Sequence, residues 1–96
     1  MAPAFSVQTT ARFDRELRKL SRRHTELANY YDGARSILEV DPYNRSRAHP
    51  IRKLEGVKPG DGQYRIRLGR FRFRYDTEGQ VVYLKACSLR REETYR

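Results

Sequence analysis

An alternation of apolar and basic residues from Tyr64 to Tyr75 constrains the fold more than any other feature of the sequence. The run Tyr-Arg-Ile-Arg-Leu-Gly-Arg-Phe-Arg-Phe-Arg-Tyr keeps a period of two residues on each side of Gly69. Because successive side chains of a strand point to opposite faces, this pattern predicts two antiparallel strands joined by a turn at Gly69. The apolar residues would then face a core, and the outer face would collect five arginines: Arg65, Arg67, Arg70, Arg72 and Arg74.

The segments around this hairpin extend it into a small sheet. Residues 76–79, with a late glycine, are typical of a hairpin loop, and the mostly apolar residues 81–87 predict a further strand near the sheet centre. Residues 5–8 alternate apolar and polar side chains, which predicts a short N-terminal strand. Residues 42–63 are rich in Pro, Gly, Asn and Ser, so we expect loops there, with one compact apolar anchor at residues 51–54.

Two helices are predicted between the N-terminal strand and the hairpin. Apolar residues recur at helical spacing over residues 10–22, with Thr9 and Thr10 as candidate N-caps, and again over residues 27–38. Asp41-Pro42 ends the second helix, because proline disfavours helical geometry in the residue before it. We therefore predict one α+β domain over residues 1–96, with a two-helix hairpin packed on a four-stranded sheet that ends in a three-stranded antiparallel meander.

The charge of the chain points to a polyanionic partner. Its 96 residues include 21 Lys and Arg against 12 Asp and Glu, which gives a formal net charge of +9. Cations on adjacent strands repel one another, so five arginines on one face are unfavourable unless an anion compensates them. A guanidinium offers a phosphate two parallel hydrogen bonds, which favours a phosphate-binding face. The alternative is the solvated polar face common in antiparallel sheets, with the charge serving solubility.

Several classes of site are excluded. The single Cys87 rules out an internal disulfide and a multi-cysteine metal site, and the sequence has no Cys/His cluster and no GxxxxGK[ST] loop. His24 and His49 lie far apart, and neither has a partner that marks it as a general base. No apolar run reaches the ~20 residues of a membrane span, and the N-terminus lacks a secretory signal pattern. We expect a cytoplasmic protein that uses neither a metal nor another cofactor.

Three segments carry a resemblance to a known family. They are His49-Pro-Ile-Arg-Lys-Leu-Glu-Gly56, Tyr64-Arg-Ile-Arg-Leu-Gly-Arg-Phe-Arg-Phe-Arg-Tyr75 and Ser88-Leu-Arg-Arg-Glu-Glu-Thr-Tyr-Arg96. Together with the order of the predicted elements, they resemble the RelE/ParE superfamily of bacterial and archaeal toxins from type II toxin–antitoxin modules. The likeness extends from Phe5 to Arg96. It implies a cognate antitoxin whose acidic or amphipathic segment lies along the helices or the sheet edge and masks the basic face.

The RelE-like branch of this superfamily consists of metal-independent ribonucleases that enter the ribosomal A site and cut messenger RNA. In these enzymes the 2′-hydroxyl attacks the adjacent phosphate, which basic residues of the sheet hold. The resemblance implies the catalytic residues Arg65, Arg67, Arg72, Arg90 or Arg91, and Tyr95, the last stacking on a base. Further substrate contacts are expected from Lys53, Arg70, Arg74 and Lys85. The identity of the general base stays open, because arginine remains protonated at neutral pH.

Two other interpretations remain. The ParE-like branch shares the scaffold, binds DNA gyrase and is not a nuclease. A nucleic-acid-binding module without catalysis is the third interpretation. The geometry of the site separates them: a ribonuclease brings the strand arginines, Arg90 or Arg91 and Tyr95 onto one concave face, whereas a gyrase binder is expected to carry an apolar surface patch.

Overall fold

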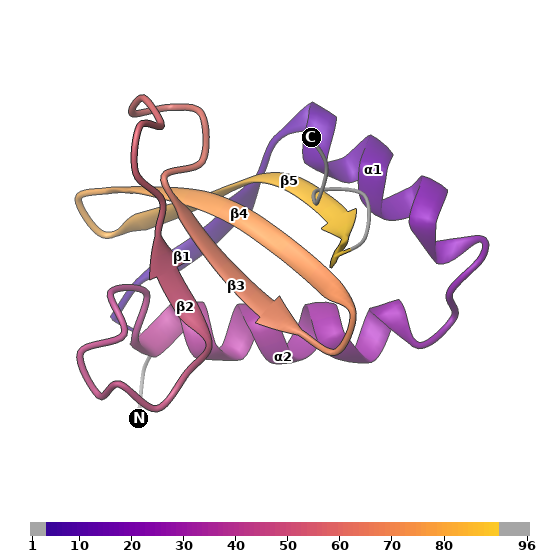
Figure 1. Ribbon diagram of the computed structural model, residues 1–96, viewed down its shortest axis with the longest axis horizontal. Coiled ribbons are helices and arrows are strands. Elements are labelled where there is room, and N and C mark those ends of the chain that lie inside the picture. The colour runs from indigo at the N-terminus through magenta and orange to yellow at the C-terminus, as the bar shows by residue number, and fades with distance from the viewer. Residues whose placement is uncertain (1–3, 91–96) are drawn as a thin grey trace.

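The chain forms one mixed sheet with two helices (Figure 1). The structure, a computed structural model, describes residues 4–90. The helices are α1 (Ala11–Ser21) and α2 (Leu27–Val40). The strands are β1 (Ser6–Thr9), β2 (Ile51–Lys53), β3 (Tyr64–Leu68), β4 (Phe71–Glu78) and β5 (Val81–Leu89). The sheet order is β1-β5-β4-β3-β2, in which β1 is parallel to β5 and all other neighbours are antiparallel.

The predicted α+β class, the helical hairpin and the three-stranded meander are confirmed. α1 begins after its N-cap Thr10, whose hydroxyl accepts a hydrogen bond from the N–H of Phe13 at 3.2 Å. α2 ends at Val40, directly before Asp41-Pro42. In the turn between β3 and β4, Gly69 has a φ of +60°, and a Cβ there would lie 2.7 Å from the ring of Tyr30. Only glycine fits this position without strain, which explains why the alternation breaks there.

The expectation of a four-stranded sheet is wrong, because Ile51–Lys53 forms β2 along the outer edge of β3. Three residues are too few to show a period of two, so this segment carries no strand signal of its own. Its partner makes it a strand, since Ile51 lies opposite Ile66 and packs against the core. The apolar anchor predicted at residues 51–54 is therefore an edge strand.

The core lies between the helices and one face of the sheet. Phe13 of α1 packs against Phe73 of β4 and Tyr31 of α2, with ring centroids 6.3 and 5.8 Å apart. Phe13, Phe73 and Tyr75 are completely buried. The hydroxyl of Tyr75 donates a hydrogen bond to the carbonyl of Pro42 at 2.8 Å, which satisfies this buried polar group. The apolar half of the alternation thus faces the core as predicted.

α1 lies beside β5 beyond the end of β1. The N–H and the hydroxyl of Thr10 both donate to the carbonyl of Leu84, at 3.2 and 3.1 Å. Farther along the helix, the carboxylate of Glu16 accepts a hydrogen bond from the N–H of Cys87 at 2.8 Å. These contacts hold the first turn of α1 next to the middle of β5, where Lys85 lies.

Candidate functional site

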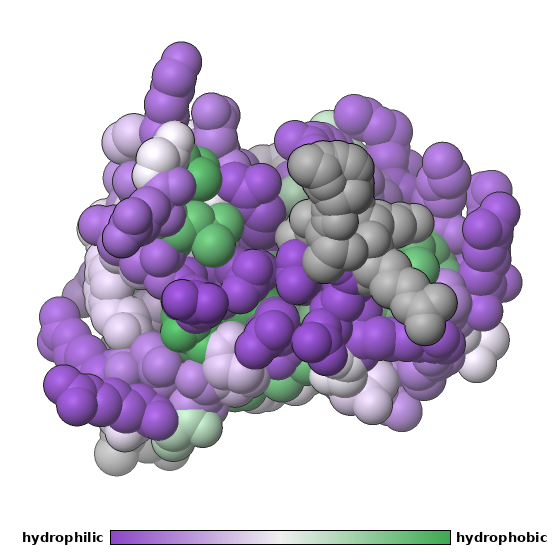
Figure 2. Space-filling model, in the orientation of Figure 1, coloured by the Kyte–Doolittle hydropathy of each residue, from purple (hydrophilic) through white to green (hydrophobic). Residues whose placement is uncertain are grey.

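The sheet face opposite the helices carries arginines in facing pairs. The strand register places Arg67 opposite Arg72 and Arg65 opposite Arg74, and β2 adds Arg52 opposite Arg65. We call these five residues the basic face. Hydrophilic side chains cover most of the molecule in the view in which β2, β3 and β4 lie in front of α2 (Figures 1 and 2). The prediction that the hairpin arginines share one face is confirmed for four of them.

The fifth predicted member, Arg70, is not part of the basic face. Its guanidinium donates to the carboxylate of Glu26 at 2.9 Å and lies 3.0 Å from Nδ1 of His24, both in the segment just before α2. Arg70 belongs to the turn rather than to β4, so the alternation of strand side chains does not apply to it. Its hydrogen bond holds the pKa of Glu26 below the usual range. The expectation of five guanidinium groups from this hairpin is corrected accordingly.

Lys53 also lies away from the basic face. It pairs with Tyr64, whose side chain lies on the core side, and its Nζ is 5.9 Å from the centroid of the Tyr64 ring. Its neighbour Arg52 takes the outward position instead. The sequence analysis missed Arg52 because it missed β2. No pattern within this three-residue segment could have found Arg52, because pairing with β3 sets its outward direction.

A β-bulge in β5 places Lys85 in the lining of the same surface hollow as Arg74, with its Nζ 5.6 Å from the centroid of the Tyr83 ring. Arg74 pairs with Ala86, but the next residue, Tyr75, pairs with Leu84, so β5 carries one extra residue at this point. The extra residue keeps Leu84 buried in the core while Lys85 lines a surface hollow together with Arg74. Of the four predicted substrate contacts, these two therefore lie together.

A loop between β2 and β3 forms one wall of this hollow, and the sheet anchors it. The carboxylate of Asp76 accepts hydrogen bonds from the N–H groups of Gly62 and Gln63, at 2.8 and 2.9 Å. Arg74 donates from Nε and Nη2 to the carbonyl of Gly62 and from Nη2 to that of Asp61. Asp76 is nearly buried, with 8% of its surface exposed. The sequence analysis placed Asp76 in a hairpin loop, which is wrong because Asp76 belongs to β4 and pairs with Tyr83. Nothing near Asp76 in the sequence shows that a distant loop needs an acceptor.

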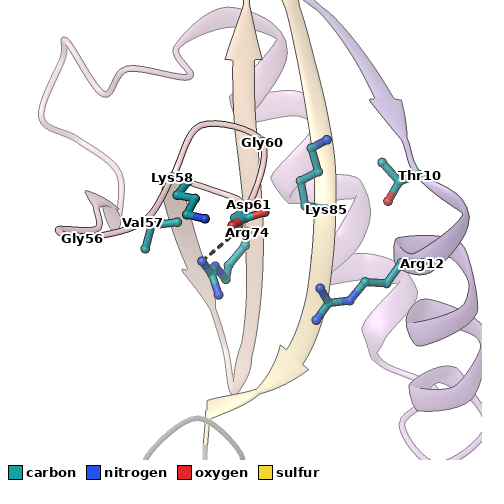
Figure 3. A pocket seen from close by; sticks show the side chains of 9 residues that line it. All are labelled: Thr10, Arg12, Gly56, Val57, Lys58, Gly60, Asp61, Arg74 and Lys85. Atoms are coloured by element: carbon teal, nitrogen blue, oxygen red, sulfur yellow. Dashed lines mark hydrogen bonds between the residues drawn. The ribbon is translucent and has the colours of Figure 1, made fainter.

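The hollow has a volume of about 560 Å³, and four of its nine lining residues are cations. Figure 3 shows Lys58 and Arg74 on the loop side, Arg12 on the helix side and Lys85 between them. Asp61 is the carboxylate among the lining residues. We call this hollow the cationic cleft. It continues the basic face toward α1, since Arg74 belongs to both.

The C-terminal candidates are described only in part. Arg91 and Tyr95 lie outside the described residues. Arg90 is exposed, and its N–H donates to the carbonyl of Arg70 at 2.9 Å, which places it at the end of the hairpin near the Arg67–Arg72 pair. The catalytic roles of Arg65, Arg67, Arg72, Arg90, Arg91 and Tyr95 stay predictions.

The histidines and the shifted phenols lie away from the basic face. His24 packs on Phe71, with ring centroids 5.7 Å apart, and His49 lies 3.8 Å from the carboxylate of Asp41. Burial raises the pKa of Tyr64 and of Tyr75, so both phenols keep their protons at neutral pH. None of these four groups is placed to take a proton from a ligand on the basic face.

Residues 4–90 hold neither a metal-binding cluster nor a membrane-spanning helix. Within that range, no three His, Cys, Asp or Glu side chains gather in a way that could hold a metal ion. None of the helices there has the length and apolar character needed to cross a membrane.

The chain resembles a known protein in structure but matches none by sequence. By sequence, no family model and no curated protein matches the chain. By structure, it matches a chain of the archaeal RelE–RelB complex from Pyrococcus horikoshii OT3, with a TM-score of 0.59 and 25% sequence identity. The match covers 91% of this chain and 96% of the archaeal one. The chain belongs to the RelE/ParE superfamily. Its RelE-like fold extends over nearly the whole sequence, as the resemblance of the three segments implied.

Proposed function

We propose that this RelE-like protein is the toxin of a toxin–antitoxin module and acts as a ribosome-dependent messenger RNA endoribonuclease. The observation that carries the proposal is the basic face itself. Arg65, Arg67 and Arg72 occupy neighbouring outward positions on β3 and β4 of a RelE-like fold. Cations placed opposite one another destabilise a sheet, and a bound phosphate backbone relieves that repulsion.

The proposed reaction is a metal-independent transesterification. The 2′-oxygen forms a bond to the adjacent phosphorus as the bond from phosphorus to the 5′-oxygen breaks. A base takes the 2′-hydroxyl proton and the 5′-oxygen gains a proton, which leaves a cyclic phosphate and a free 5′-hydroxyl. The guanidinium groups cannot serve as the base, since they stay protonated. Their contribution is to position the phosphate and to stabilise the charge that builds up on its oxygens.

A cognate antitoxin is the second part of the proposal. The structural neighbour was crystallised as a RelE–RelB complex, which supports a protein partner for this chain too. A net charge of +9 and a surface with facing arginines favour an acidic segment in that partner.

The exposed apolar residues give less support to the ParE-like alternative. In the described part of the chain, the large ones are Tyr30, Val40 and Tyr43. Tyr30 lies near the start of α2 and Val40 at its end, about 15 Å apart along the helix axis. Tyr30 and Val40 therefore do not belong to one apolar patch of the kind expected of a gyrase binder.

The test is cleavage of a defined message on translating ribosomes, mapped by primer extension. Wild-type protein is expected to cut in the A site, and Arg65→Ala/Arg72→Ala to cut at least about 10²-fold more slowly. The matched control is Arg18→Ala/Arg22→Ala, which removes an exposed cation of α1 and its exposed C-cap residue and should cut at the wild-type rate. An intact message together with blocked gyrase supercoiling would replace this proposal with the ParE-like function.

A further inference from the structure

The cationic cleft gathers charges from three separate parts of the chain. Arg12 comes from the first turn of α1, Lys58 from the loop between β2 and β3, and Arg74 and Lys85 from β4 and β5. Like charges brought together by the fold repel one another unless an anion lies among them. Arg12 has a partner, since its Nε donates to Glu16 at 3.1 Å, whereas Asp61 is the one carboxylate among the lining residues. The lining therefore keeps an excess of positive charge.

The walls of the cleft are held in place. Two residues of β4 hold the loop at Gly62. Asp76 accepts a hydrogen bond from the N–H of Gly62, and Arg74 donates one to its carbonyl. Gly62 has a φ of +83°, and a Cβ there would lie 3.0 Å from the Cβ of Arg74, so the loop backbone lies directly on the strand. Thr10 holds the opposite wall against Leu84. Because the cations stand on fixed elements, a ligand binds without first ordering them.

The spacing of the cations along β4 matches a nucleic acid strand. Arg72 and Arg74 are two residues apart on one face, which is about 7 Å. This is of the order of the separation of successive phosphates in an extended single strand. The Arg67–Arg72 pair and the cationic cleft thus lie one phosphate apart along the basic face.

We propose that the cationic cleft binds a second phosphodiester group of a single-stranded RNA, next to the phosphate held by the Arg67–Arg72 pair. Arg74 lies between both positions, because it belongs to the basic face and also lines the cationic cleft, where its Nε and Nη2 donate to the loop carbonyls. Lys58 and Lys85 reach the phosphate from either side of the cleft. The inference rests on the proposed function in one respect, which is that the bound nucleic acid is RNA.

The test measures binding of a fluorescent, fully 2′-O-methylated oligonucleotide, which cannot be cleaved because its 2′-oxygens are blocked. Fluorescence anisotropy over a series of salt concentrations gives the dissociation constant and its salt dependence. Lys58→Ala/Lys85→Ala is expected to bind about tenfold more weakly. Its slope of log K against log salt should be smaller by about 0.7, the value of one phosphate contact on a single strand.

Two variants make this test specific. Arg18→Ala/Arg22→Ala loses the same charge from the exposed side of α1 and should keep the wild-type slope. Asp61→Asn removes the carboxylate from the lining and should bind more tightly. Thermal melting of all variants checks that each is folded.

The length of the oligonucleotide gives a second readout. Wild-type protein should gain affinity between a dinucleotide with one phosphodiester and a trinucleotide with two, and the Lys58/Lys85 variant should lose that gain. Equal slopes and affinities in the cleft and control variants, or no binding by the wild type at low salt, would overturn the proposal. Cleavage is measured separately, so a protein that binds as expected but does not cut refutes the ribonuclease function alone.

Discussion

The two faces of the β3–β4 hairpin arise from alternate residues of one run, yet their chemistry is opposite. On the core face, Ile66 lies opposite Phe73 and both are completely buried. On the basic face, Arg67 lies opposite Arg72 and Arg65 opposite Arg74. The first arrangement lowers the free energy of the folded state, whereas facing cations in the second repel one another. The proposed ligand binding therefore uses the side of these strands that does not form the core.

The largest difference between the two faces is expected in the free energy of unfolding when one side chain on each face is replaced by alanine. Phe73→Ala leaves a cavity in the core and should lower the free energy of unfolding by about 3–5 kcal/mol. Arg67→Ala should change it by no more than about 0.5 kcal/mol, because it removes a half-buried cation that faces another. Urea unfolding of both variants measures the contrast. A large loss of stability in Arg67→Ala would mean that the basic face also holds the fold together.

A smaller loss of stability is expected from a substitution in the turn that joins β3 and β4. Gly69→Ala puts a side chain at a φ of +60° and 2.7 Å from the ring of Tyr30, which should cost about 2–4 kcal/mol. Gly33→Ala is the matched control, because its Cβ would lie 3.8 Å from Leu68 in ordinary contact. Alanine favours a helix over glycine, so this control should gain about 0.5–1 kcal/mol. Thermal melting compares the two, and equal melting temperatures would show that the turn tolerates a side chain.

Each face was predicted from the sequence only where the alternating pattern is long enough to be clear. The period-two run defined β3, β4 and the outward direction of Arg65, Arg67, Arg72 and Arg74, because four or more alternating residues carry a clear pattern. Arg70 was misplaced, since a strand period stops applying at a turn. Arg52 was missed, because a three-residue edge strand exists only through its partner.

The cationic cleft was beyond the reach of sequence patterns for a different reason. Its members come from α1, a loop, β4 and β5, and only the tertiary fold brings them together. The bulge that places Lys85 in the lining of the cleft leaves no mark in the alternation of an apolar central strand. Asp76 holds the loop through backbone N–H groups, which every non-proline residue carries, so no sequence motif announces that contact.

The smallest effect on stability is expected at Arg70, which lies outside the basic face and pairs with Glu26. The hydrogen bond from Arg70 lowers the pKa of the Glu26 carboxyl below its ordinary value of 4.5. A carboxyl with a lowered pKa in the folded state stabilises the protein above that ordinary value, and the contribution disappears as the pH falls through the lowered one. In Arg70→Ala, the pKa of Glu26 should rise toward its ordinary value, as followed by an NMR titration of the carboxyl.

Asp41 is the internal control for this titration. Its pKa is lowered by the hydroxyl of Ser46 and by the N–H groups of Arg45 and Ser46, none of which involves Arg70. Asp41 should therefore titrate identically in wild type and Arg70→Ala. If Glu26 also titrated identically, the Arg70 side chain would be free of α2 in solution. It could then turn to the basic face, and the fifth hairpin arginine predicted from the alternation would return to the binding surface.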